Sequence, residues 1–179
     1  MLTLKEAVIF RFTKRNLRLV AANFFRTMTS SPMASPRSSK FRFALVVSVF
    51  NREYTDALLA SAQTALKGHD LTIVRVPGAY EIPLQVQRLA RTGKFAAVIA
   101  LGVVWQGKTL HAQEILRAVT DALMRISLEN DLPVIHEVLA VSSEAEAKAR
   151  CMGVKLNRGL EAAQAALALA LADRAKGKD

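Results

Sequence analysis

The chain has 179 residues and carries 25 lysine and arginine residues against 15 aspartate and glutamate residues, which gives a formal net charge of +10. The charge is uneven, because residues 1–40 hold eight of the basic residues and only one of the acidic residues. The remaining residues, 41–179, are nearly balanced, which argues against a phosphate-tracking nucleic-acid surface on that part. We expect residues 41–179 to form one domain with one hydrophobic core.

The cysteine content and the length of the apolar runs exclude further classes of protein. The only cysteine, Cys151, excludes an intramolecular disulfide, and with three scattered histidines it argues against a metal site. A reducing compartment, the cytoplasm, fits best. No apolar run approaches the roughly 20 residues that span a bilayer, so we expect no membrane segment.

Residues 1–40 differ in composition from the rest of the chain. They are rich in arginine, poor in acids, and end in a serine- and proline-rich stretch at residues 29–39. This composition is typical of a disordered arm, of an organelle transit peptide, or of dispensable sequence translated from a start upstream of the functional one. Met33 is an alternative start.

From residue 41 onward, two kinds of pattern alternate. Short β-branched runs without polar alternation predict strands covered on both faces, at residues 43–49, 71–76, 96–104 and 133–141. Helical patterns follow at residues 53–67, 82–91, 111–129, 144–151 and 157–173. Strict alternation predicts a parallel four-stranded sheet in a three-layer α/β domain. Ligands of such sheets bind outside the carboxyl ends of the strands.

Three aromatic residues follow the expected strands. Phe50, Tyr80 and Trp105 come at or just beyond the ends of the first, second and third strands. Each alone is equally well explained as core or interface filler. Together at the ligand-binding edge, they favour a flat, π-rich heterocyclic substrate that stacks on a ring.

The second strand runs into the turn Pro-Gly-Ala-Tyr-Glu-Ile-Pro at residues 77–83. Gly78 allows close approach of the backbone, and Glu81 opens the next helix. Glu81 is either a favourable acid in a first helical turn or an acceptor for a polyhydroxyl chain.

The third strand is followed by Gln-Gly-Lys-Thr-Leu-His at residues 106–111. Gly107 frees the backbone, we expect Thr109 to cap the next helix, and Lys108 adds a positive charge, so this segment predicts a phosphate site. His111 is either a surface residue or, beside that site, a proton carrier.

Two arginines occur late in the chain. Arg150 is either a solvated helix residue or a bidentate phosphate ligand. Arg158, in Asn-Arg-Gly at residues 157–159, starts the last helix and is either a solvated helix residue or a substrate-binding residue. The residue order supplies no Ser-His-Asp set and no Walker loop.

These segments, from Phe50-Asn51 through the turn at 77–83 and residues 101–111 to Arg150 and Asn157-Arg158-Gly159, resemble the 6,7-dimethyl-8-ribityllumazine synthase family in order and spacing. The resemblance covers residues 41–173. It implies a flavodoxin-like three-layer αβα sandwich, pentamers or pentamer-based shells, and active sites shared between subunits. It also implies condensation of 5-amino-6-(D-ribitylamino)uracil with 3,4-dihydroxy-2-butanone 4-phosphate, without cofactor or metal. Riboflavin synthase is a further candidate partner.

The resemblance also implies roles for single residues. Phe50, with Asn51 beside it, would stack on the pyrimidine, and His111 would shuttle the proton. The remaining roles are a ribityl site at Ala79, Tyr80 and Glu81, a ring edge at Val103, Val104 and Trp105, and phosphate ligands at Lys108, Thr109 and, from a neighbouring subunit, Arg150.

Four positions depart from the pattern of that family. His136 stands where phenylalanine is more common, Gln106 and Val49 where arginine is frequent, and Arg158 where lysine is usual. The reaction type is unaffected, while His136 either stacks on the substrate or titrates.

Rival classes are less consistent with the sequence. A flavodoxin-like electron carrier needs a glycine-rich phosphate loop after the first strand, and a receiver domain needs an acidic pair there. Neither is present. The main alternative is a catalytically weak flavin- or lumazine-binding shell protein of the same fold.

Overall fold

The computed structural model describes residues 40–107 and 109–177. Its sheet contains four parallel strands in the order β2-β1-β3-β4. Their bounds are β1 Arg42–Ser48, β2 Asp70–Val76, β3 Ala97–Trp105 and β4 Val134–Val141. The predicted strands are therefore confirmed, with ends that differ by one residue at most.

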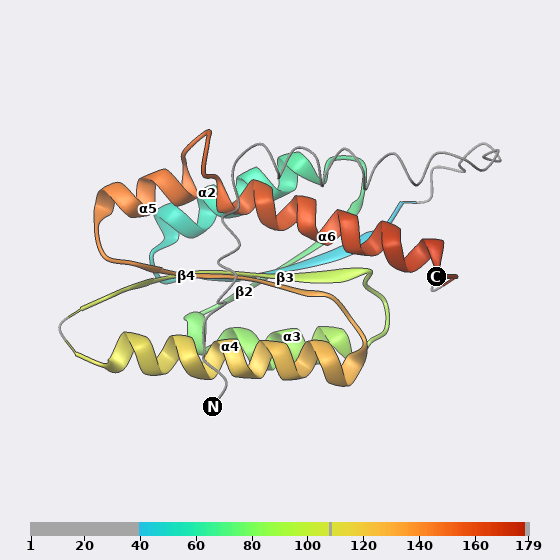
Figure 1. Cartoon of the computed structure of the whole chain (residues 1–179), viewed down its shortest axis with the longest axis horizontal. Coiled ribbons are helices and arrows are strands. Elements are labelled where there is room, and N and C mark those ends of the chain that lie inside the picture. The colour runs from blue at the N-terminus through green and yellow to red at the C-terminus, as the bar shows by residue number, and fades with distance from the viewer. Residues whose placement is uncertain (1–39, 108, 178–179) are drawn as a thin grey trace, which may run out of the picture. The chain divides into compact units, whose positions relative to one another are not determined.

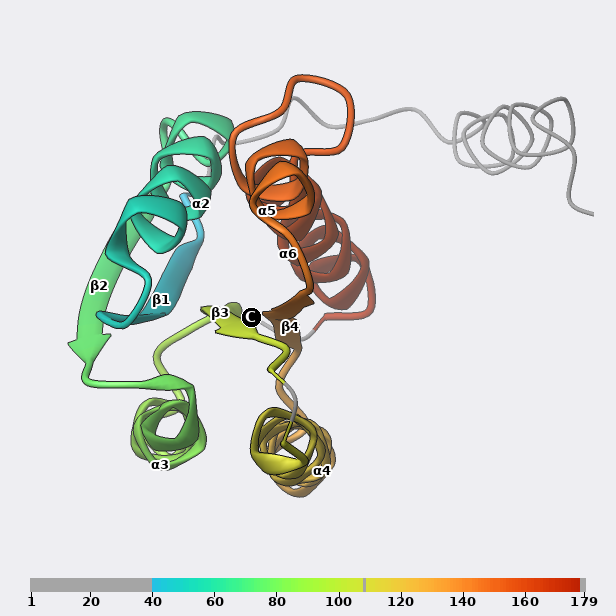
Figure 2. The ribbon, with the colours of Figure 1, turned by 90° about the vertical axis from the view of Figure 1, so that its left-hand side faces the viewer.

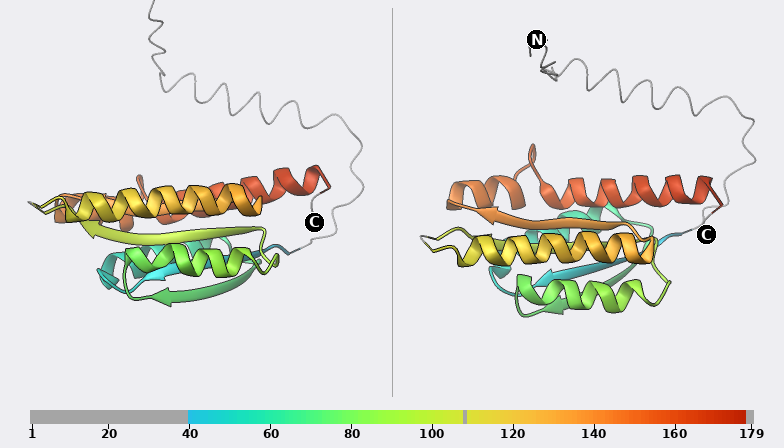
Figure 3. Two further views of the ribbon diagram at one scale, coloured as in Figure 1. Left: turned by 90° about the horizontal axis from the view of Figure 1, so that it is seen from below. Right: turned by 60° about the horizontal axis from the view of Figure 1, so that its bottom comes forward.

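Helices cover both faces of the sheet (Figures 1 and 2). On one face lie α2 Arg52–Ala65, α5 Glu144–Cys151 and α6 Arg158–Ala175, and on the other α3 Ile82–Ala90 and α4 His111–Asn130. Figure 3 shows α3 and α4 side by side across their face. A short 3₁₀ helix, η1 Ala79–Glu81, precedes α3 and was not predicted. The three-layer α/β prediction is confirmed, and no described helix is long and apolar enough to cross a membrane.

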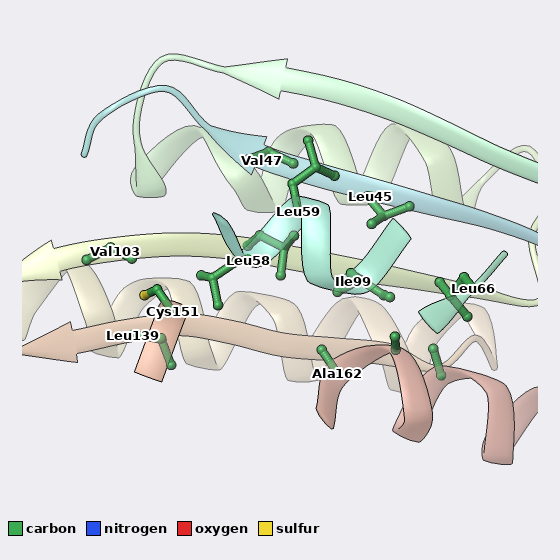
Figure 4. Close-up of a cluster of buried hydrophobic side chains, with 14 of the residues drawn as sticks. Leu45, Val47, Leu58, Leu59, Leu66, Ile99, Val103, Leu139, Cys151 and Ala162 are labelled. Atoms are coloured by element: carbon green, nitrogen blue, oxygen red, sulfur yellow. The ribbon is translucent and has the colours of Figure 1, made fainter. Parts of the chain in front are cut away.

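The sheet separates two hydrophobic clusters. Figure 4 shows the cluster beneath α2, α5 and α6, in which Leu45, Leu58 and Ile99 are fully buried. The central strands β1 and β3 are covered on both faces, as expected. The same expectation is wrong for β2, where Ile73 is 40% exposed, because β2 is an edge strand that pairs on one side with β1 and on the other with no strand of the described residues.

Helix α6 approaches α2 closely at Gly159. A Cβ atom at this position would lie 2.3 Å from the carbonyl oxygen of Leu58. The small side chains of Ala162, Ala163 and Ala166 continue the buried face of α6. Glycine and alanine therefore allow these two helices to pack at short distance.

The C-terminal end of α6 packs against the chain at the beginning of β1. The guanidinium carbon of Arg174 lies 3.9 Å from the ring centroid of Phe41, and the ring of His69 contacts both Phe41 and Phe43. The backbone N–H of Phe41 also donates to His69 Nδ1 at 3.3 Å. These contacts lie at the amino ends of the strands, so His69 is distant from the edge at which ligands were expected.

Candidate active site

The chain crosses the carboxyl edge of the sheet in segments that stay paired beyond the strands. The backbone N–H groups of Val49 and Phe50 donate to the carbonyls of Val76 and Pro77 at 2.8 and 3.0 Å. Gln106 N–H donates to Val141 at 2.8 Å in the same way. The loops after β1 and β2 therefore leave the sheet together, as do those after β3 and β4.

Phe50 forms an exposed aromatic surface at this edge. Its side chain is 71% exposed, and one face of the residue lies against Gly78, where a Cβ would be 3.2 Å from Phe50 Cδ2. A shallow depression of about 500 Å³ lies beside the ring, lined by Val49, Phe50, Arg75, Val76 and Pro77. A planar apolar group can rest in this depression against the ring.

The turn after β2 is closed by Glu81. Its carboxylate accepts a hydrogen bond from Gly78 N–H at 2.9 Å, which fixes the 3₁₀ turn between them. Tyr80 is 65% exposed, whereas Ala79 is buried. The turn therefore presents the Tyr80 ring and the Glu81 carboxylate to solvent, and Ala79 anchors it to the core.

Asn51 connects the end of β1 to the end of β3. Its backbone is left-handed, with φ 57°. Its side-chain amide donates to the Val103 carbonyl at 2.8 Å and accepts from Trp105 Nε1 at 3.0 Å. Tyr54 packs edge-on against Trp105 with ring centroids 5.8 Å apart. Asn51 and Tyr54 thus fix the indole ring, while the Val103 side chain is buried in the core and Val104 is half-buried.

Helix α4 begins at His111, and its first residues are exposed. The expected capping by Thr109 is wrong: Leu110 is the N-cap residue, and no side chain makes a capping hydrogen bond. Thr109 is exposed and so is available to a ligand. Lys108 lies outside the described residues. The structure therefore places Gly107, Thr109 and His111 together at the carboxyl end of β3.

His136 does not join these residues. It pairs with Ala100 in the interior of β4, five residues before Val141, which corresponds to about 16 Å along a strand. Its Nε2 lies 3.0 Å from Thr120 Oγ1 of α4. Burial lowers the pKa of His136, which favours the neutral imidazole.

Arg158 is engaged by two carboxylates. Its Nε and Nη2 donate to Glu137 at 3.1 and 3.0 Å, and its Nη1 donates to Glu161. Glu137 is 6% exposed, and this burial raises the pKa of its carboxyl, an effect that Arg158 opposes. Sequence reasoning missed Glu137, although a single acid within an apolar strand was a usable signal.

Arg150 is half-buried near the end of α5 and pairs with Glu146 at 3.1 Å. Glu146 also accepts hydrogen bonds from the backbone N–H and the hydroxyl of Ser142, both at 2.9 Å. Glu146 thereby holds Arg150 beside the loop that follows β4.

Metal and thiol chemistry find no support in the described part of the chain. No group of three or more histidine, cysteine or acidic side chains could hold a metal ion among these residues. Burial raises the pKa of the Cys151 thiol to about 11, so the thiolate is scarce at neutral pH. His69, His111 and His136 lie in three separate places.

The arrangement at the sheet edge combines aromatic surfaces, a carboxylate turn and a histidine at a helix start. These features define a three-layer α/β enzyme whose candidate site lies at the carboxyl ends of β1, β2 and β3.

Comparison with known proteins gives the family. Residues 40–174 match the family model described as 6,7-dimethyl-8-ribityllumazine synthase. Proteins of that name from Xanthomonas euvesicatoria pv. vesicatoria and Stenotrophomonas maltophilia are each 39% identical, over 74% and 75% of this chain and 90% and 89% of theirs. The protein of that name from Salinibacter ruber is 40% identical over 72% of this chain and 86% of its own. The chain belongs to the 6,7-dimethyl-8-ribityllumazine synthase family.

Proposed function

We propose that this chain is a transferase of riboflavin biosynthesis that condenses 5-amino-6-(D-ribitylamino)uracil with 3,4-dihydroxy-2-butanone 4-phosphate, releasing phosphate and water. The observation that carries the proposal is that the matched segments after β1, β2 and β3 meet at one edge of the sheet, with Phe50 exposed beside a depression.

The residues at this edge suit the pyrimidine substrate. Phe50 stacks on the pyrimidine ring, and Trp105, fixed by Asn51, lines the ring edge with the backbone of Val103 and Val104. The ribityl hydroxyls bind at the Ala79–Glu81 turn, where the Glu81 carboxylate accepts hydrogen bonds. Binding by these fixed groups orients the amine of the pyrimidine toward the second substrate.

The start of α4 suits the phosphate of the second substrate. Thr109 and Lys108 bind the phosphate, and the N–H groups at the helix start, which no described side chain caps, contribute further donors. His111, in the first turn, moves the proton between the reacting groups. The amine is already nucleophilic and phosphate is a good leaving group, so orientation supplies much of the rate enhancement.

We propose that two assigned residues act from a second subunit. His136 lies in the interior of β4, away from the Phe50 edge, and Arg150 pairs with Glu146 beside the loop that follows β4. Large apolar side chains on the outer helices, among them Leu84 at 59%, Met124 at 61% and Leu128 at 75% exposure, supply a surface for another copy. We propose a pentamer or a pentamer-based shell in which Arg150 and His136 enter a neighbour's site. Riboflavin synthase is a further proposed partner, and the cytoplasm the proposed location.

The functional unit is residues 41–179, and residues 1–40 are a dispensable extension. The family match supports this division because it begins at residue 40. A chain that starts at Met33 should assemble and turn over like the full chain. Loss of assembly on this truncation would instead give the extension a structural role.

The function is tested by mixing the purified protein with both substrates and following the absorbance of the lumazine product. We expect a rate well above that of the spontaneous condensation. A rate equal to the spontaneous one, with tight binding of the product, would identify a lumazine-binding shell protein instead.

A further inference from the structure

Among the residues that the structure describes, Arg75 is the one charged residue that lines the depression beside Phe50. It is the second-last residue of β2, and its neighbour Val76 is buried in the cluster beneath α3. Because side chains alternate along a strand, Arg75 projects to the α2 side. The other lining residues, Val49, Phe50, Val76 and Pro77, are apolar, so Arg75 alone among them offers side-chain hydrogen-bond donors.

The Arg75 guanidinium is held on one side. Its Nη2 lies 2.7 Å from Asp56 Oδ1, and Asp56 Oδ2 accepts from Arg52 Nε at 3.0 Å. Burial acts to raise the pKa of Asp56, but the hydrogen bonds from Arg75 and Arg52 outweigh it, and the pKa is lowered. Asp56 is therefore ionised at neutral pH, and the three side chains together carry one net positive charge.

We propose that Arg75 is a further substrate-binding residue that donates hydrogen bonds to the carbonyl oxygens of the pyrimidine ring stacked on Phe50. The inference deepens the proposed function and rests on it. A planar guanidinium that is paired through Nη2 has further N–H donors, on Nε and Nη1, with which to bind a ring beside it. Pyrimidinedione carbonyls are acceptors in the plane of that ring, so stacking and hydrogen bonding are satisfied together.

The phosphate of the second substrate does not compete for this guanidinium. Its proposed ligands follow β3, and β1 lies between β2 and β3 in the sheet. Two strand spacings separate the two places by about 10 Å. Arg75 therefore acts on the pyrimidine substrate and leaves the butanone phosphate unaffected.

The test compares Arg75→Met with Arg52→Met. Each variant removes one of the two arginine partners of Asp56, but Arg52 is not among the residues that line the depression. The readouts are the KM for each substrate and the Kd for an unreactive 5-nitro-6-ribitylaminouracil analogue, measured by titration calorimetry. We expect Arg75→Met to weaken analogue binding and raise the pyrimidine KM by about 10-fold or more, the range for a hydrogen bond from a charged group. The KM for butanone phosphate should change less than about twofold.

Arg75→Lys provides a second variant that keeps the charge but not the planar fork, and it should recover only part of the affinity. Equal losses for both substrates, equal losses in Arg75→Met and Arg52→Met, or unchanged analogue binding would each overturn the assignment. Failure of the wild-type protein to accelerate the condensation would contradict the proposed function, while analogue binding would still decide the role of Arg75.

Discussion

The guanidinium of Arg158 donates two hydrogen bonds to the buried carboxylate of Glu137, which joins the first turn of α6 to the interior of β4. This pair accounts for an acid within an otherwise apolar strand. The pair occupies the Nε and Nη2 edge of an arginine that the sequence predicts to bind substrate, and Glu161 accepts from the remaining nitrogen, Nη1. The structure therefore favours a role for Arg158 in holding α6 on the sheet.

The two partners of this pair should differ in how much stability they contribute. Arg158→Ala leaves Glu137 buried without a partner and should lower the free energy of unfolding by about 3 kcal/mol. Glu137→Ala leaves Arg158 paired with Glu161 and should cost about 2 kcal/mol or less. Urea denaturation of the two variants and the wild type measures the difference. Equal or reversed costs would show that Glu161 contributes little to holding Arg158.

His136 should make the protein less stable in mild acid. Its pKa is lowered below the ordinary value of 6.5 by burial, so the unfolded chain binds a proton that the folded chain does not. The contribution of neutral His136 to the free energy of unfolding is therefore fully present above pH 6.5. It is lost as the pH falls toward the lower pKa that His136 has in the folded protein. Melting temperatures at about pH 5 and about pH 7.5 should differ less in His136→Phe than in the wild type.

A matched variant separates titration from packing in this experiment. His136→Gln keeps a hydrogen-bonding group for Thr120 but cannot titrate. It should show the same flattened pH dependence as His136→Phe, whatever its absolute stability. A wild-type slope in either variant would assign the acid sensitivity to other groups.

Asn51 should control the position of the single tryptophan. Asn51→Gly tolerates the left-handed backbone but removes both side-chain hydrogen bonds, which should cost about 2 kcal/mol and leave Trp105 more mobile. Tryptophan fluorescence, which reports Trp105 alone, should shift to longer wavelength. Asn51→Ala should be less stable than Asn51→Gly by about 1 kcal/mol because of its left-handed backbone. Unchanged emission in both variants would show that Tyr54 suffices to hold the indole.

Shared sites can be detected by mixing two impaired variants. His111→Ala should lower turnover about 100-fold and leave binding of the pyrimidine analogue nearly intact. Arg150→Ala should weaken the binding of butanone phosphate. If the two residues act from different subunits, co-refolded mixtures regain an intact pair at about a quarter of the sites. Activity should then exceed the mean of the separate variants. Mixed assemblies, verified by mass, that show only the mean would place both residues in one subunit's site.

Much of the fold could be predicted from the sequence because strand patterns and helix patterns alternate strictly along the chain. The apolar runs fixed β1 and β3 to within a residue, and strand ends located Phe50 and Trp105 at the expected edge. The predicted range 133–141 already placed His136 within a strand, which indicates a location away from the other site residues.

The remaining features depend on contacts between distant residues. Asn51 bonds to Val103 and Trp105, more than fifty positions away, and Glu137 meets Arg158 across 21 positions. Neither pair has a local pattern that distinguishes it from solvated polar residues. The pairing of Arg75 with Asp56 is also set by the crossing of β2 and α2, which composition and periodicity do not specify.

The contact between Arg174 and Phe41 brings the end of α6 beside the start of β1, at the amino ends of the strands. Phe50, Glu81 and His111 lie at the opposite, carboxyl edge. A dye, an affinity handle or a solid support attached after α6 is therefore on the far side of the domain from the proposed site. Immobilised protein coupled through that end should keep the carboxyl edge of its sheet open to the solution.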